Sequence, residues 1–221
     1  MNELNQAYRE NKEVPYFTPI NLPIVEPDDW DVWWKIWNEN FDKLFKKQYF
    51  HSEERVPTGK VQVWNGIQVY DPADTSQDPT KMTFPVVDIR NSLPKMYDQL
   101  QELKKYFLGK NINFAFIQSL YPIKPHTDRN SNIWMARQFF YNPVESQQWY
   151  FTKPFDKLGE TRTYIKMPED TPWFGFNDGL MWHGTDFDEN RKKILLKVYG
   201  TLHHEILQDS MNKYKDYVLC Q

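Results

Sequence analysis

The sequence predicts a mainly β fold with flanking helices, whose core is a double-stranded β-helix, also called a jelly roll. Eight short segments after residue 110 carry the alternating apolar residues of half-buried strands, with turn residues between them. Their number and close spacing fit a jelly-roll core. Two segments with the apolar spacing of amphipathic helices precede these strands. Because the helices come before the strands, we expect the helices to cover one sheet of a β-sandwich.

Length and composition indicate one domain and exclude several classes of protein. The chain has 221 residues, of which 17% are aromatic, so one large core can form. A net charge of −3 and a pI near 6.0 argue against a nucleic-acid partner, because such binding requires the neutralisation of several phosphates. No apolar run could span a bilayer, and the first residues lack the features of a signal peptide. We therefore expect a soluble cytoplasmic protein without membrane contact; the sequence does not indicate its oligomeric state.

The N-terminal part is predicted to form an arm and a helix. Residues 1–27 are polar at first and then rich in proline, which favours an extended arm along the body of the protein. Asp28 and Asp29 suit the first turn of a helix that follows this arm. We expect the apolar stripe of the helix to pack on the main sheet; a surface for a partner is the alternative. The stripe consists of Trp30, Trp33, Trp34, Trp37, Phe41, Leu44 and Phe45.

Two loops and a hairpin are predicted after this helix. Residues 51–60 are rich in charge and are expected to form a loop. Alternating apolar residues on both sides of Asn65-Gly66 predict a β-hairpin over residues 61–70. Residues 71–82 are polar and contain two Asp-Pro steps, so they are either a connector or a mobile flap over a substrate.

A second helix is predicted from about residue 92 to residue 108, with Gly109 at its end. We expect residues 1–110 to pack on a core formed by residues 111–202, and residues 203–221 to form a short helix or tail. No boundary divides the chain into two domains. The apolar stripe of the second helix is Leu93, Met96, Tyr97, Leu100, Leu103 and Phe107. The predicted strands of the core lie near residues 112–120, 124–128, 135–142, 148–152, 162–167, 173–176, 180–184 and 193–201.

One stretch of the core combines a histidine with a carboxylate. His126 and Asp128 follow a proline-bracketed turn, and two residues apart on a strand they point to the same face. An imidazole and a carboxylate on one face are two of the three ligands of a facial metal site. His183 is the candidate for the third ligand, because His51 lies in a charged loop and the remaining two histidines are adjacent to each other. A structural zinc site is not expected, since Cys220 is the only cysteine.

Together with the basic residues after His183, this set resembles the Fe(II)- and 2-oxoglutarate-dependent oxygenases, and loosely their aspartyl/asparaginyl and prolyl hydroxylase branches. The family pattern is His-x-Asp, then a distal His, then a basic residue some eight to ten positions later. Arg191 follows His183 by eight positions, and Lys193 lies two residues further on the same face of the strand. The resemblance covers residues 111–200.

The resemblance implies an oxidoreductase, more closely a dioxygenase that acts as a hydroxylase. His126, Asp128 and His183 would bind Fe(II) and leave three coordination positions open, two of them for the co-substrate 2-oxoglutarate. Arg191 would bind the far carboxylate of 2-oxoglutarate through its two-pronged guanidinium, with Lys193 as the alternative. In such enzymes 2-oxoglutarate is converted to succinate and CO2. The substrate implied is a C–H bond of an amino-acid side chain in a peptide or protein, or in a free amino acid.

Arg137 is a further candidate for binding an acid group. It is flanked by apolar residues on a predicted strand, where an unpaired guanidinium would be costly. In the aspartyl/asparaginyl branch an arginine at a similar distance after His-x-Asp contacts an acid group. Arg137 is therefore either a ligand for a carboxylate of co-substrate or substrate, or the partner of a structural Asp or Glu. Tyr121, Trp134 and Trp182 either line the pocket or belong to the core.

Two other functions remain open at the level of sequence. The first is a cupin-like metal-binding protein without 2-oxoglutarate chemistry, against which the basic residues after His183 argue. The second is a non-catalytic jelly-roll interaction protein, in which His126, Asp128 and His183 would lie in unrelated places. A structure in which these side chains fail to converge would favour the second alternative.

Overall fold

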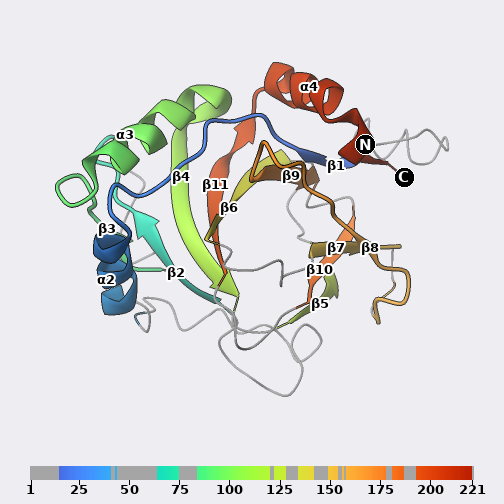
Figure 1. Cartoon of the computed structure of the whole chain (residues 1–221), viewed down its shortest axis with the longest axis horizontal. Helices are drawn as coiled ribbons and strands as arrows, with labels where there is room; N and C mark the ends of the chain where they lie inside the picture. The colour runs from blue at the N-terminus through green and yellow to red at the C-terminus, as the bar shows by residue number, and fades with distance from the viewer. Residues whose placement is uncertain are drawn as a thin grey trace.

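A computed structural model shows a mainly β chain with two sheets and helices on the outside of the larger one (Figure 1). Some of the predictions fall outside the described residues. They are the charged loop 51–60, most of the loop 71–82, and the candidate site residues Tyr121, Asp128 and Arg191. The structure describes residues 15–40, 43, 64–74, 84–119, 122–127, 134–141, 149–153, 156, 158–177, 181–186 and 193–220.

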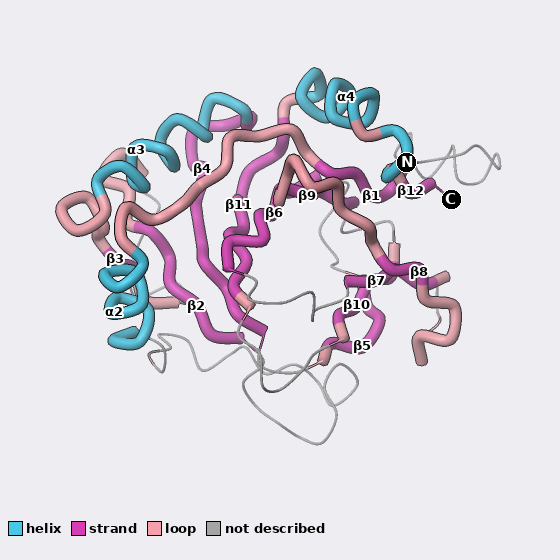
Figure 2. The backbone as a smooth tube through the Cα atoms, in the orientation of Figure 1, coloured by secondary structure: helices cyan, strands magenta, loops and turns pink. Residues whose placement is uncertain are grey.

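Within the described residues, the larger sheet has eight strands, all of which pair antiparallel except β2 with β3. It is strongly curved, and the helices lie on its convex side (Figure 2). In spatial order, the strands of the large sheet are β12 (Leu219–Cys220), β1 (Pro15–Pro19), β9 (Trp173–Asn177), β6 (Trp134–Tyr141), β11 (Ile194–Leu202), β4 (Phe107–Ser119), β2 (Trp64–Val69) and β3 (Val86–Val87).

The smaller sheet has four strands in the described part of the chain, and it packs on the concave side of the large sheet (Figure 1). From β4 onward the chain passes repeatedly between the sheets, since β4, β6, β9 and β11 belong to the large sheet and the strands between them to the small one. All eight predicted core strands coincide with observed strands, although β8 is shorter than predicted. The order in the small sheet is β5 (Ile123–His126), β10 (Trp182–Thr185), β7 (Trp149–Thr152) and β8 (Thr163–Tyr164).

Two separate cores follow from this arrangement. The outer core lies between the helices and the convex face of the large sheet, and the inner core lies between the two sheets. Side chains of a strand alternate between these cores, so that Phe174 and Phe176 of β9 face inward while Trp173 faces the helices. We call these two sides of the large sheet its inner and outer faces.

The first predicted helix is confirmed as α2 (Trp30–Asn40), and it packs on the outer face. Trp33 and Trp37 are almost fully buried, and the ring of Trp33 makes edge-to-face contacts with Phe116 and Phe140 of the sheet. The apolar stripe of α2 therefore belongs to the core, as expected. Asp29 begins the helix, because its carboxylate accepts hydrogen bonds from the backbone N–H groups of Asp31 (2.8 Å) and Val32 (3.2 Å).

Replacement of Asp29 by alanine is expected to reduce the free energy of unfolding by about 1 kcal/mol, because these two N–H groups lose their acceptor. Urea unfolding monitored by circular dichroism measures the change. Glu39→Ala on the exposed side of the same helix is the control and should change stability by less than about 0.5 kcal/mol. Equal stability of both variants would contradict the capping role.

The predicted hairpin at Asn65-Gly66 is wrong. Both residues lie inside β2, which pairs with β4 along its length, Asn65 opposite Gln118 and Gly66 opposite Ile117. A Cβ atom at Gly66 would lie 2.7 Å from the carbonyl oxygen of Phe116. The glycine thus allows a close approach of two strands. In the sequence, a glycine with this role looks the same as the glycine of an Asn-Gly turn.

The second helix is confirmed but ends earlier than predicted. It comprises α3 (Pro94–Leu103) and a 3-10 turn, η1 (Lys104–Tyr106), after which β4 begins. Phe107 continues the helical spacing in the sequence, yet it pairs with Leu202 on β11 and is buried there. Gly109 has φ of 103° and lies within the strand, where it does not end a helix. Pairing with a distant strand has overridden the local period.

The C-terminal segment folds back on the large sheet. It forms α4 (His204–Lys213), a 3-10 turn, η2 (Lys215–Tyr217), and then β12, which pairs with β1. The N-terminal arm and the end of the chain therefore close the same edge of the sheet. Among the described helices, none is long and apolar enough to cross a membrane.

Candidate functional site

His126 and His183 lie opposite each other on neighbouring strands of the small sheet. β5 and β10 pair antiparallel with His183 directly across from His126, and the centroids of the two imidazole rings are 4.5 Å apart. The two histidines are far apart in sequence, so this convergence depends on the fold. The structure thus brings together two of the three predicted metal ligands.

A bulge in β5 sets the register of this pair. Between the pairs His183–His126 and Thr185–Ile123, β5 advances by one residue more than β10 does. Pro125, which has no N–H to donate, lies in this interval on a strand at the edge of the sheet. Proline is tolerated at such edge and bulge positions because no ladder hydrogen bond is lost there.

A tyrosine and a glycine hold the bulge from the outer side of the small sheet. The hydroxyl of Tyr150 on β7 donates a hydrogen bond of 3.2 Å to the carbonyl oxygen of Ile123. The ring of Tyr150 lies over Gly184, where a Cβ atom would come within 2.5 Å of the Ile123 oxygen and would also collide with the Tyr150 hydroxyl. Glycine next to His183 is therefore required by the close packing of three strands.

Hydrogen bonds orient both imidazole rings in the same way. Nδ1 of His126 lies 2.9 Å from the carbonyl oxygen of Lys124, and Nδ1 of His183 lies 3.2 Å from the carbonyl oxygen of Met181. A carbonyl oxygen only accepts hydrogen bonds, so Nδ1 carries the proton in each ring and Nε2 has the lone pair. This is the tautomer in which a histidine coordinates a metal through Nε2, with its other nitrogen held by a carbonyl.

Aromatic side chains surround His183. Its side chain is buried, and its ring stacks at 5.9 Å on Trp149 and contacts Phe176 at 4.7 Å between centroids. The neighbouring Trp182 must point to the opposite face of β10, since adjacent strand residues alternate. Trp134 lies in the outer core. Neither tryptophan therefore belongs to the surroundings of His183, whereas Trp149, which the sequence did not single out, does.

Arg137 on β6 lies beside these same aromatic rings. Its guanidinium carbon is 4.0 Å from the centroid of Phe176 and 5.8 Å from that of Trp149, and Nη1 donates to the carbonyl oxygen of Met135 at 3.1 Å. The residue is 97% buried on the inner face. Phe176 and Trp149, the two rings that contact His183, thus also contact the guanidinium of Arg137.

Lys193 is a second buried cation of the inner face. It directly precedes β11, is only 2% exposed, and its Nζ lies 4.3 Å from the ring centroid of Phe139. Burial lowers the pKa of Lys193 to about 7, because removing the ammonium from water disfavours its charged form. Phe139 stacks on Phe174 in the inner core, so Lys193 faces the same interior as Arg137.

The described part of the candidate centre consists of the histidine pair. Asp128 and Arg191 lie outside the described residues, so the predicted third ligand and first-choice co-substrate anchor stay predictions. Within the described ranges, no group of three or more His, Cys, Asp or Glu side chains is close enough to hold a metal ion. The assignment of a complete triad therefore rests on the sequence spacing of Asp128 from His126.

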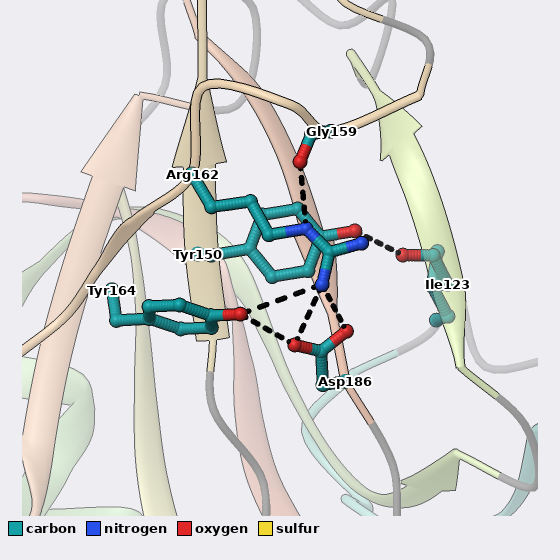
Figure 3. Close-up of polar contacts among 6 residues, drawn as sticks. All are labelled: Ile123, Tyr150, Gly159, Arg162, Tyr164 and Asp186. Atoms are coloured by element: carbon teal, nitrogen blue, oxygen red, sulfur yellow. Dashed lines mark hydrogen bonds and ion pairs between the residues drawn. The ribbon is translucent and has the colours of Figure 1, made fainter.

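Sequence reasoning missed a polar network on the outer side of the small sheet (Figure 3). Arg162 donates to both carboxylate oxygens of Asp186, at 2.8 and 2.9 Å, and its guanidinium lies 4.6 Å from the ring centroid of Tyr150. The hydroxyl of Tyr164 also donates to Asp186, at 2.7 Å. Asp186 directly follows β10, so the network links the end of this strand to the β8 hairpin. No local pattern pairs Asp186 with Arg162 and Tyr164, because it follows them by 24 and 22 residues.

Comparisons with known proteins identify no family for this chain. No protein-family model matches it, and no curated protein matches it. One similar solved structure is a prolyl-4-hydroxylase from Pseudomonas putida, with 10% identity and a TM-score of 0.39 over 91% of this chain and 98% of that one. Another is IDO from Bacillus thuringiensis, with 12% identity and a TM-score of 0.33 over 55% of this chain and 64% of that one. Similarities this weak carry no argument about the activity.

Proposed function

We propose that this chain is a non-haem Fe(II)- and 2-oxoglutarate-dependent dioxygenase on a double-stranded β-helix. The observation that carries the proposal is the cross-strand pair of His126 and His183, whose rings are 4.5 Å apart with Nδ1 of each next to a carbonyl oxygen. The repeated passage of the chain between two sheets from β4 to β11 supports the jelly-roll core. The proposed family is the one that the sequence pattern His-x-Asp…His resembles.

The donor atoms of the pair fit a ferrous ion. Two imidazole Nε2 atoms and the carboxylate of Asp128 would form a facial triad, which suits Fe(II) and leaves sites for a bidentate co-substrate and dioxygen. When bound, the iron and 2-oxoglutarate supply oxidative decarboxylation and the hydroxylation of a C–H bond. Trp149 and Phe176 contact the ring of His183, which is buried, and so shield it from water.

Lys193 is our preferred anchor for the far carboxylate of 2-oxoglutarate. Sequence reasoning placed Arg191 first and Lys193 second, and the burial of Lys193 on the inner face supports the second choice. An ammonium at this position can bind a carboxylate through a charge-assisted hydrogen bond. The role of Arg191 as an anchor stays a prediction of the sequence resemblance.

The affinity for 2-oxoglutarate is expected to fall as the pH rises above about 7. The pKa of Lys193 is lowered to about 7, so above this pH a proton must be taken up when the carboxylate binds. The loss can reach tenfold per pH unit above about pH 7, and it ends where the pH passes the pKa of Lys193 in the complex with the carboxylate. The effect of Lys193 on folding stability has the opposite sign. Between about pH 7 and pH 10.5 the unfolded chain binds more protons than the folded protein, so the contribution of Lys193 to the free energy of unfolding rises with pH in this range.

Lys193→Met is expected to weaken 2-oxoglutarate binding by about 10- to 100-fold at pH 6.5 and to remove the pH dependence. Calorimetric titration of the Mn(II)-loaded protein from pH 6 to 9 measures both effects. Lys166→Met replaces an exposed lysine and serves as the control. Binding that is unchanged in Lys193→Met would assign the anchor to another residue, with Arg191→Met as the next variant.

Anaerobic titration with Fe(II) and then 2-oxoglutarate tests the function as a whole. We expect the weak visible charge-transfer band of a bidentate chelate, followed by succinate release once oxygen and a substrate are admitted. The proposed substrate is an amino-acid side chain, in a peptide or protein or as a free amino acid. Iron binding without the band would favour a cupin-like protein without 2-oxoglutarate chemistry, and the absence of both would favour a non-catalytic jelly roll.

A further inference from the structure

A row of cross-strand partners crosses the outer side of the small sheet, behind the histidine pair. Tyr164 on β8 pairs with Tyr150 on β7, and Tyr150 pairs with Gly184 on β10, the residue next to His183. The rings of the two tyrosines meet edge to face, with 5.8 Å between their centroids. Side chains alternate along a strand, so Gly184 faces this row while His183 faces the aromatic rings of the inner core. The row therefore lies directly behind one of the two histidines.

Arg162 lies over this row and is joined to the end of β10. Its guanidinium lies above the ring of Tyr150, and its Nη1 atom donates to both carboxylate oxygens of Asp186 (Figure 3). The hydroxyl of Tyr164 donates to the same carboxylate. Asp186 directly follows β10 and comes three residues after His183. Arg162 thus fixes the end of the strand that carries His183.

The same arginine is also joined to β5, the strand that carries His126. Nε of Arg162 donates to the carbonyl oxygen of Gly159 at 2.9 Å. A Cβ atom at Gly159 would lie 3.3 Å from Cγ of Pro125, so the turn around Gly159 packs against the proline in the bulge of β5. Beneath the guanidinium, the hydroxyl of Tyr150 donates to the β5 carbonyl oxygen two residues before this proline. Contacts on both sides of the bulge therefore converge on one guanidinium.

The turn that carries Gly159 is itself held in place by hydrogen bonds. The carboxylate of Asp156 accepts from the backbone N–H groups of residues 159–161, at 2.8, 3.1 and 2.7 Å, and from the hydroxyl of Thr161 at 2.7 Å. These bonds, with that of the Thr161 hydroxyl as the largest cause, lower the pKa of Asp156 to about 2. Arg162 is therefore held between an ordered turn and the end of β10.

With the proposed function as the basis, we propose that Arg162 is a positioning residue for the metal centre. It joins the strands of His126 and His183 from behind and so holds their two imidazole rings in register for one metal ion. Asp186 and Tyr164 act through Arg162, because they hold its guanidinium. A single surface ion pair contributes little to stability, so the network acts through its place between the two strands. Ligands that outer contacts hold in position bind a metal more tightly, because fewer conformations are lost on binding.

Titration with Co(II) tests this role, because the visible absorption of the bound ion reports the geometry of its ligands. Arg162→Gln in the full chain is expected to raise the Kd for Co(II) about tenfold and to change the absorption spectrum. Asp186→Asn keeps the shape of the side chain and should act in the same direction with a smaller effect. The double variant should bind about as tightly as Arg162→Gln, because both changes act on one network. Additive losses in the double variant would contradict a common route.

Arg90→Gln is the matched control for a general loss of stability. Arg90 donates to both carboxylate oxygens of Asp88 and lies 5.3 Å from the ring centroid of Tyr70, beside β2 and β3 of the large sheet. The ion pair thus has the same kinds of contact far from the histidine strands in the sheet order. We expect a similar loss of unfolding stability but a Kd for Co(II) within about twofold of the unaltered protein. Equal weakening of Co(II) binding in both variants would overturn the proposal, as would an unchanged Kd in Arg162→Gln.

A milder variant keeps the test decisive if Arg162→Gln does not fold, which circular dichroism detects. Tyr164→Phe removes only the hydroxyl that donates to Asp186, on a ring that is partly exposed. Weaker Co(II) binding by a folded Tyr164→Phe protein would support the positioning role. Binding as tight as that of the unaltered protein would overturn it.

Nitrogen NMR of the imidazole rings tests the positioning without a metal. In the unaltered protein we expect Nδ1 to carry the proton in both His126 and His183. In Arg162→Gln we expect a mixture of tautomers at His126, because a shift of β5 disturbs the contact with the Lys124 carbonyl oxygen. Unchanged tautomers would contradict the role of Arg162. If the unaltered protein binds no Co(II), the proposed function fails, while the tautomers still decide whether Arg162 positions the pair.

Discussion

Replacement of Gly184 by alanine is expected to lower the free energy of unfolding by about 3 kcal/mol. The new Cβ atom would lie 2.5 Å from the carbonyl oxygen of Ile123 and would collide with the Tyr150 hydroxyl. The Ile123 oxygen belongs to the backbone of a paired strand, so it cannot move away without changing the pairing of β5 with β10. Urea unfolding monitored by tryptophan fluorescence measures the loss.

The matched control for this variant is Gly200→Ala on β11. A Cβ atom there would meet the side chain of Phe107 at 3.3 Å, a contact that small shifts relieve, so we expect a loss below about 1 kcal/mol. If both variants were equally stable, the packing of Tyr150 over Gly184 would not hold the strands together. Tyr150→Phe keeps the ring and removes only the hydrogen bond to Ile123, and should cost about 1 kcal/mol.

His183→Ala is expected to abolish Fe(II) binding at concentrations that saturate the unaltered protein. The substitution removes one of two imidazole ligands, and the remaining His126 and Asp128 cannot form a facial triad. The 2-oxoglutarate chelate band should disappear with the metal. Anaerobic titration, together with metal analysis after gel filtration, measures the loss.

Two further variants make this result specific. His204→Ala removes an exposed histidine on α4 and should leave metal binding unchanged. Because His183 is buried among aromatic rings, its truncation also leaves a cavity, so His183→Gln is tested beside it and unfolding is recorded for both. A folded His183→Gln protein that binds Fe(II) as tightly as the unaltered protein would exclude His183 as a ligand.

Local patterns predicted most elements because side-chain burial imposes a period on the sequence. The tryptophan stripe of α2 follows from one buried side of the helix, and the nearly continuous apolar runs of β6 and β9 follow from the burial of these strands on both faces. The two errors share a cause. Asn65-Gly66 and the helical spacing at Phe107 are valid local signals, but pairing with β4 and β11 outweighs them.

The candidate site was predictable only as a set of residue types. The spacing of His126, Asp128 and His183 indicated a metal centre, and the apolar neighbours of Arg137 indicated a buried cation. Nothing local indicated that His183 lies opposite His126, because cross-strand register depends on where the bulges fall.

The sequence by itself determined which segments form strands and helices, and which residue types are available for a metal and for acid groups. Only the tertiary structure decided that His126 faces His183, through the bulge at Pro125 and the packing of Tyr150 over Gly184. Only it placed Arg137 and Lys193 beside aromatic rings of the inner core. The reason is physical: burial leaves a periodic trace in the chain, whereas contacts between distant strands depend on register and close packing, which no local period encodes.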